Sequence, residues 1–218
     1  MKLDEDQRAW FTRVQEEWRA RLQPASTSLG QHVFEVGPKP PHAAVRDGRL
    51  FGSRSDALDV LPKGGVVAEV GTQTGFFAER ILATSRPAAL HLFDLEFDTL
   101  RRERPAVASD SRVQLHLGDS SAELAGLADG SFDWIYIDGD HTFEGVRRDT
   151  EVAIRKLKPD GVLVFNDYTV WSIMELEPYG VVAVVNALLA GGAWEMIYLA
   201  LHPLMYCDVA LRRRSGRS

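Results

Sequence analysis

Residues 66–75 read VVAEVGTQTG, a short apolar run that ends in a turn containing two glycines. Helical sequence follows, from about Phe76 to Ser85. Gly71 and Gly75 free this turn for a ligand to approach its backbone, and the start of the following helix offers unpaired N–H groups. The stretch therefore predicts a strand, a turn and a helix, with a ligand site at the turn.

The same pattern recurs along the chain and predicts the fold class. Further apolar runs occupy residues 89–94, 113–117, 132–138 and 161–167, and a helix is expected from His141 to Leu157. Alternating strands and helices indicate a doubly wound, mostly parallel sheet. Residues 194–201 and 205–211 are joined by only three residues, a connection that permits only an antiparallel pair. We expect an α/β fold whose seven-stranded sheet closes on a C-terminal antiparallel hairpin.

The N-terminal quarter of the chain has a different pattern. Residues 4–22 predict an amphipathic helix with an apolar stripe, and a proline-rich loop follows to about Arg54. The stripe contains Trp10, Val14, Trp18 and Leu22. We expect residues 1–54 to form a cap or oligomerisation element and residues 55–218 to form the ligand-binding domain. The stripe is expected to pack on the domain or in a homodimer, with a lid over a pocket as the alternative.

Composition excludes several classes of partner. The 218 residues include 25 Lys and Arg against 31 Asp and Glu, a net charge of −6. An acidic chain has no general attraction for nucleic acid or anionic membranes. Cys207 is the single cysteine, so no intrachain disulfide is possible, and no apolar stretch is typical of a signal peptide or a membrane span. We expect a cytoplasmic protein that acts on a small molecule.

Polar residues at the first three strand ends indicate what ligand binds, because ligands of open α/β sheets lie beyond the carboxyl ends of the strands. The turn has the spacing G-x-x-x-G and lacks the dinucleotide fingerprint G-x-G-x-x-G. Glu69 would repel a pyrophosphate, so a cationic or zwitterionic ligand suits the turn. Asp94 is placed to accept the hydroxyls of a ribose. Asp119, with Ser120 beside it, either accepts from an adenine amino group or caps a helix.

The ends of the last two predicted parallel strands carry side chains suited to metal binding and proton transfer. Asp138 ends one strand, Asn166 and Asp167 end the next, and three oxygen donors there predict a site for Mg²⁺ or a similar hard cation. His141 follows Asp138 at the start of a helix, where the helix dipole favours a neutral imidazole that can take a proton. The alternatives are acids and a histidine that only cap helices.

Taken together, these residues resemble a class I S-adenosylmethionine-dependent methyltransferase, and are most similar to O-methyltransferases of the macrolide- and aminocoumarin-sugar type. The resemblance covers about residues 65–213. It implies that the methyl donor contacts a set of residues along the strand ends: Glu69, Gly71, Thr72, Gly75, Asp94, Asp119, Ser120 and Asp138. It also implies His141 as general base, aided by Asp138. In the resembled enzymes the fifth strand ends in two aspartates, whereas here the first is Asn166.

The sequence therefore predicts a methyltransferase for a small molecule, with O-methylation and divalent-metal assistance as the specific expectation. Asn166 leaves open a catalytically inactive S-adenosylmethionine-binding regulatory protein. A nicotinamide-dependent oxidoreductase is a further alternative, opposed by the missing fingerprint and the antiparallel hairpin. Sugar hydroxyls, catechol-like phenols and amines all remain open as acceptors.

Overall fold

The computed structural model describes residues 3–28 and 36–214, in two compact units, residues 1–35 and 36–218. In the first unit, helix α1 (Glu5–Ser28) begins at a capping box. Asp4 Oδ1 accepts from Gln7 N at 2.8 Å, and Gln7 Oε1 accepts from Asp4 N at 3.1 Å. Trp10 is exposed and meets the ring of Phe11 edge-on. The side chains of Trp18 and Leu22 lie outside the described residues, so the role of the stripe stays a prediction.

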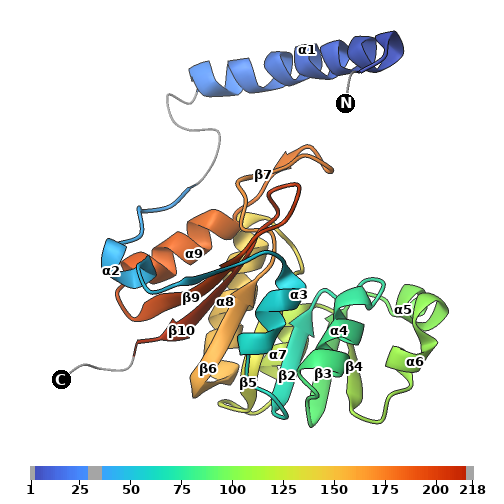
Figure 1. Cartoon of the computed structure of the whole chain (residues 1–218), viewed down its shortest axis with the longest axis vertical. Coiled ribbons are helices and arrows are strands. Elements are labelled where there is room, and N and C mark those ends of the chain that lie inside the picture. The colour runs from blue at the N-terminus through green and yellow to red at the C-terminus, as the bar shows by residue number, and fades with distance from the viewer. Residues whose placement is uncertain (1–2, 29–35, 215–218) are drawn as a thin grey trace. The chain divides into compact units, whose positions relative to one another are not determined.

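Within the described chain, the second unit contains one sheet of eight strands, in the order β1-β9-β10-β6-β5-β2-β3-β4 (Figure 1). Strand β10 is antiparallel to both neighbours, and the other pairs are parallel. The predicted parallel sheet and closing hairpin are thereby confirmed. The bounds are β1 (Arg49–Phe51), β2 (Val66–Val70), β3 (Ala89–Asp94), β4 (Val113–Leu117), β5 (Phe132–Ile137), β6 (Leu157–Phe165), β9 (Trp194–Ala200) and β10 (Asp208–Arg213).

The eighth strand, β1, lies in the segment expected to be a loop. It pairs in parallel with the outer side of β9 and follows a short helix, α2 (His42–Val45). The prolines that suggested a loop end at Pro41, so the backbone donors of residues 49–51 remain free to pair. A short antiparallel hairpin of β7 (Trp171–Ser172) and β8 (Glu177–Pro178) stands apart from the main sheet.

Helices cover both faces of the sheet because side chains alternate along each strand. In β5, Trp134 and Tyr136 pack into one apolar cluster, while Ile135 and Ile137 pack into the other. The first cluster includes helices α3 (Arg54–Ala57), α4 (Phe76–Thr84), α5 (Asp98–Glu103) and α6 (Pro105–Ala108), with the 3-10 turn η1 (Leu58–Val60). The second includes α2, α7 (Ser120–Ala125), α8 (Phe143–Lys156) and α9 (Val181–Ala190).

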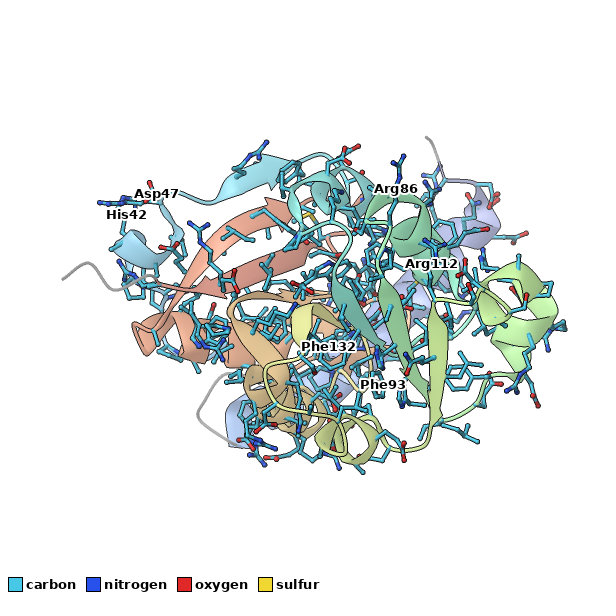
Figure 2. All side chains as sticks on the ribbon, turned by 90° about the horizontal axis from the view of Figure 1, so that it is seen from below. His42, Asp47, Arg86, Phe93, Arg112 and Phe132 are labelled. Carbon is cyan, nitrogen blue, oxygen red and sulfur yellow. The ribbon has the colours of Figure 1, made fainter. Side chains whose placement is uncertain are left out.

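Phe93 and Phe132 belong to this second cluster and are labelled in Figure 2. They come from different strands, β3 and β5, on either side of β2. Both are fully buried, so the core on this face runs continuously across the centre of the sheet. Over the described ranges, the helices include none that combines the length and apolar character needed to cross a bilayer.

Backbone hydrogen bonds continue one residue past the strands and tie neighbouring strand ends together. Their lengths are 2.8–3.0 Å, and they run from Gly71 N to Phe93 O, Asp138 N to Val70 O, Asn166 N to Ile137 O and Gly118 N to Asp94 O. The residues that follow the strands are therefore held in register with one another.

The turn after β2 depends on a close backbone approach. Gly71 has φ +84°, a left-handed conformation, and a Cβ there would overlap the carbonyl oxygen of Asp138. Glycine at this position thus brings the turn after β2 against the loop after β5.

We predict that Gly71→Ala destabilises the protein far more than Gly192→Ala. Gly192 has φ +80° and open space where a Cβ would lie, so its replacement carries only the conformational cost, about 1 kcal/mol. Gly71→Ala adds the clash with Asp138, for a total of about 3 kcal/mol or more. Free energies of unfolding from chemical denaturation measure both variants, and equal losses would contradict the close-approach explanation.

Candidate functional site

A cavity of about 820 Å³ lies beyond the carboxyl ends of the central strands. This volume is within the usual range of small-molecule sites. The cavity brings together most of the predicted site residues: Glu69, Gly71, Thr72, Asp94, Asp119, Ser120, Asp138, His141, Asn166 and Asp167. The strand ends that the sequence singled out therefore converge on one pocket.

Gly75 is the predicted donor residue that does not line this cavity, as far as the described chain shows. It precedes α4 with φ +74°, and its N–H donates to Thr72 O at 2.8 Å to close the turn. The side chain of Leu100 fills the position that a Cβ would take. Turn geometry and packing explain this glycine.

Asp94 stabilises the glycine turn from the neighbouring strand. Its Oδ2 accepts from Thr72 N at 2.9 Å and from Gln73 N at 2.7 Å. Its Oδ1 has a longer contact, 3.4 Å from Glu96 N. One carboxylate oxygen therefore shapes the turn, and the other is the candidate for ligand hydroxyls.

The capping alternative for Asp119 is confirmed. Its Oδ1 accepts from Ala122 N at 3.0 Å at the start of α7, and from Ser121 Oγ at 2.6 Å. Ser120 Oγ donates to buried Asp149 at 2.8 Å. Both residues still line the cavity, so their contact with an adenine ring stays a prediction.

Glu69 places a buried carboxyl group in the cavity wall. The residue is 1% exposed, and its Oε2 has no hydrogen-bond partner among the described residues. Burial raises its pKa well above the usual value, and the charges of Asp138 and Asp94 raise it further. A cationic ligand group would compensate the charge of this buried carboxylate. The ammonium and sulfonium groups of S-adenosylmethionine carry such a charge.

His141 lines the same cavity and lies among carboxylates. Its Nε2 is 3.5 Å from Asp138 Oδ1 and 3.8 Å from Asp167 Oδ2. Its ring stacks on Tyr179, with centroids 4.5 Å apart and an angle of 11° between the planes. The imidazole is thus held against two acids with its ring orientation fixed.

The nearby carboxylates act on the pKa of His141 in the direction opposite to that expected from the helix dipole. Burial acts to lower its pKa, but the hydrogen-bonding and charge effects of Asp138 and the charges of Asp167 and Glu175 raise it, and the net shift is upward. His141 also precedes α8, whose N-cap is Thr142, so it lies outside the helix. Its neutral state in the free protein stays a prediction.

The predicted metal ligands meet, but their donor set does not fit a divalent ion. Asn166 Nδ2 donates to Asp138 Oδ1 at 2.5 Å, and Asn166 Oδ1 lies 3.1 Å from the hydroxyl of Tyr136. The amide thus turns an N–H, not an oxygen, toward Asp138. Among the residues described, no three His, Cys, Asp or Glu side chains are arranged to hold a metal ion.

A buried group of polar side chains that was not predicted from the sequence lies beneath these strand ends. Tyr136 is fully buried, and its hydroxyl lies 2.9 Å from Oδ2 of Asp208, which is 1% exposed. Arg54 Nη1 donates to the same hydroxyl at 3.3 Å. Burial raises the pKa of Asp208 to about 7, although Arg54 and Tyr136 act against the shift. An acid at the start of the apolar run Asp208-Val209-Ala210-Leu211 was the signal available in the sequence.

Comparisons with known proteins match the central part of the chain to methyltransferases. The family described as "Methyltransferase domain" matches residues 68–168. Dimethylglycine N-methyltransferase of Parasynechococcus marenigrum is 31% identical over 127 residues, covering 57% of this chain and 45% of that protein. The probable O-methyltransferase Rv1220c of Mycobacterium tuberculosis is 31% identical over 137 residues, covering 56% and 61%. The chain thus spans about half the length of these curated relatives.

A solved SAM-dependent methyltransferase from Aquifex aeolicus superposes with a TM-score of 0.55 at 14% identity, covering 73% of this chain and 89% of that one. This likeness concerns the fold. Residues 68–168 thus match a methyltransferase domain, and the chain is similar in fold to a solved S-adenosylmethionine-dependent methyltransferase and in sequence to O-methyltransferases.

Proposed function

We propose that the chain transfers a methyl group to an oxygen of a small-molecule acceptor, with His141 as general base. The observation that carries this proposal is the position of His141, which lines the same cavity as the donor-side residues and lies between Asp138 and Asp167. A general base must lie where it can reach the acceptor proton, and His141 lines the cavity in which an acceptor would bind.

The donor-side residues would hold S-adenosylmethionine at the glycine turn. Gly71 allows close approach to the backbone, Asp94 offers an oxygen for ribose hydroxyls, and buried Glu69 complements positive charge. When bound, this donor supplies an electrophilic methyl group on a sulfonium. The protein's main task is then to hold an acceptor oxygen in line with that group.

At the acceptor end, the imidazole of His141 accepts the hydroxyl proton while the acceptor oxygen gains the methyl group. The sulfonium becomes a neutral thioether, so one proton on His141 balances the reaction. Asp138 and Asp167 stabilise the imidazolium that forms, and Tyr179 keeps the ring in place. The same carboxylates raise the pKa of His141 in the free enzyme, so its imidazolium loses a proton less readily.

Several finer expectations enter only as proposals. Oxygen as the methyl acceptor is supported by Rv1220c, while the dimethylglycine enzyme keeps an amine acceptor open. A small-molecule acceptor is supported by the volume of the cavity and the acidic chain. Magnesium assistance stays a prediction to which we assign no step, because Asn166 turns an N–H toward Asp138. The homodimer and the cytoplasmic location also stay predictions.

A donor-binding protein without catalysis is the second candidate, and Asn166 was the feature that favoured it. The hydrogen bond from Asn166 to Asp138 weakens this alternative, because it orients a carboxylate beside the proposed base. Turnover against a panel of methyl glycosides, catechols and primary amines, with tritium-labelled methyl donor, separates the two candidates. Methylation of any of these compounds supports the enzyme and identifies the type of atom methylated.

We predict that S-adenosylhomocysteine stabilises the protein and that NAD does not. At about 100 times its dissociation constant, a ligand that binds only the folded state adds about 2.7 kcal/mol. A thermal-shift comparison of the two compounds, each with Mg²⁺ and with a chelator, measures this effect. Stabilisation by NAD alone, or by neither compound, would overturn the proposed function.

We predict that His141→Ala lowers the turnover number by about 10²- to 10⁴-fold, because proton removal is lost. The dissociation constant of S-adenosylhomocysteine should change little, since His141 lies at the acceptor end of the cavity. The matched control is His42→Ala, an exposed histidine outside the cavity, which should keep wild-type turnover. Near wild-type rates in His141→Ala would rule out this residue as the base.

We predict that kcat/KM rises with pH, with a midpoint above the ordinary histidine value of 6.5. The base form of His141 must be neutral, and the neighbouring carboxylates raise its pKa. Asp138→Asn removes the largest of these effects while burial remains, so its midpoint should move to lower pH. A pH–rate series on both proteins tests this order, and a midpoint that stays fixed would contradict it.

A further inference from the structure

Arg54 brings a fixed positive charge to the strand ends where a metal ion was expected. It begins helix α3, whose N-cap is Ser53, and its side chain reaches the cavity wall. Its Nε lies 3.5 Å from Asp208 Oδ1, and its Nη2 lies 3.8 Å from Asp167 Oδ1. One guanidinium therefore joins an acid of β10 to the acid that follows β6.

The positive charge of Arg54 matters because the two acids that it contacts, Asp167 and Asp208, are largely buried. The side chain of Asp208 is 1% exposed and that of Asp167 is 14% exposed, while that of Arg54 is 25% exposed. Two nearly buried carboxylates that lost their cation would be left uncompensated, at a large cost. Arg54 also lies over the ring of Phe77, with its Cζ 5.9 Å from the centroid, which helps to fix its position.

Asn166 and Tyr136 complete an arrangement suited to this arginine. Tyr136 receives the hydrogen bond of Arg54 and lies within hydrogen-bond distance of Asn166 and Asp208. Asn166 contributes no charge and donates to Asp138. A second aspartate at position 166 would add a negative charge and remove this donor. The neutral amide of Asn166 and the guanidinium of Arg54 thus occur together. This is expected if the positive charge at the site comes from an arginine of the chain and not from a bound metal ion.

A guanidinium has five N–H donors in a planar fork, more than its protein contacts here use. Since Arg54 lines the cavity and is partly exposed, donors remain for an acceptor oxygen. Hydrogen bonds aimed at an oxygen that gains negative charge stabilise it, as a metal ion would.

We propose that Arg54 takes the place of the divalent ion in this site: its guanidinium contacts the acceptor oxygen as that oxygen loses its proton to His141, and methyl transfer proceeds without Mg²⁺. This inference rests on the proposed function. It assigns Arg54 as a catalytic residue and explains why the asparagine at position 166 is compatible with an active enzyme.

The first test measures metal binding directly and needs no acceptor. Mg²⁺ is titrated calorimetrically into the protein saturated with S-adenosylhomocysteine. The wild type should show no saturable binding up to about 1 mM, whereas the double variant Arg54→Ala/Asn166→Asp should bind one ion per chain in that range. Wild-type binding that Asp167→Asn abolishes would overturn the proposal, and so would a folded double variant that binds no Mg²⁺.

The second test uses the compound that the acceptor panel identifies as a substrate. Turnover should be the same with chelator and with Mg²⁺, and Arg54→Ala should lower it by about 100-fold or more. Arg54→Lys keeps the charge without the planar fork and should retain an intermediate rate. The control, Arg46→Ala, removes an exposed arginine paired with Asp47 outside the cavity and should keep the wild-type rate.

These outcomes separate the inference from the proposed function. Loss of turnover with chelator, or a wild-type rate in Arg54→Ala, would overturn the role of Arg54 while leaving a methyltransferase. Absence of stabilisation by S-adenosylhomocysteine would overturn the proposed function itself. The shift caused by this compound in each Arg54 variant shows whether that variant is folded with an intact donor site.

Discussion

The hydrogen bonds that tie each strand end to its neighbour are the constraint on which this site depends. Asp138 N bonds to Val70 O and Asn166 N bonds to Ile137 O, so the loops after β2, β5 and β6 begin in fixed register. The close approach at Gly71 tightens the same arrangement. Side chains from distant parts of the sequence thereby start from one rigid edge, and their separations are set by the sheet.

Charge balance is the second theme of the site. Carboxylates dominate the cavity, and burial makes their mutual repulsion costly. The charges are compensated in two ways: Glu69, before the glycine turn, has a raised pKa, while His141 and Arg54 lie beside Asp167. Burial and Asp138 raise the pKa of Asp167 to about 6, against the effects of His141 and Arg54. The pocket as a whole suits ligands that carry positive charge or donate hydrogen bonds.

The parts of this structure that follow from local pattern were predictable. Apolar runs and the three-residue turn at residues 202–204 predicted the mostly parallel sheet, the hairpin and the convergence of Asp94, Asp138 and His141. Local pattern offered the cap at Asp119 only as one of two alternatives, and it did not show that Gly75 closes a turn or that Asn166 turns its N–H toward Asp138.

The buried contacts among Arg54, Tyr136 and Asp208 could not be predicted from local pattern, for a different reason. Tyr136 lies 82 residues from Arg54 and 72 from Asp208 along the chain, so no spacing rule links them. Their contact depends on β10 inserting between β6 and β9, a pairing that the hairpin suggests but whose register it does not fix. The prolines before residue 42 also hid the strand that leads to Arg54.

That strand, β1, has a consequence for how the chain can be divided. It covers part of the outer edge of β9, at Tyr198, Leu199 and Ala200, and leads within three residues to Arg54. A fragment starting at residue 55 would bare the backbone donors and acceptors of a seven-residue edge strand, which invites association between molecules. The segment from β1 to Arg54 therefore both protects the edge of β9 and supplies a positive charge to the cavity. Deleting it would remove both.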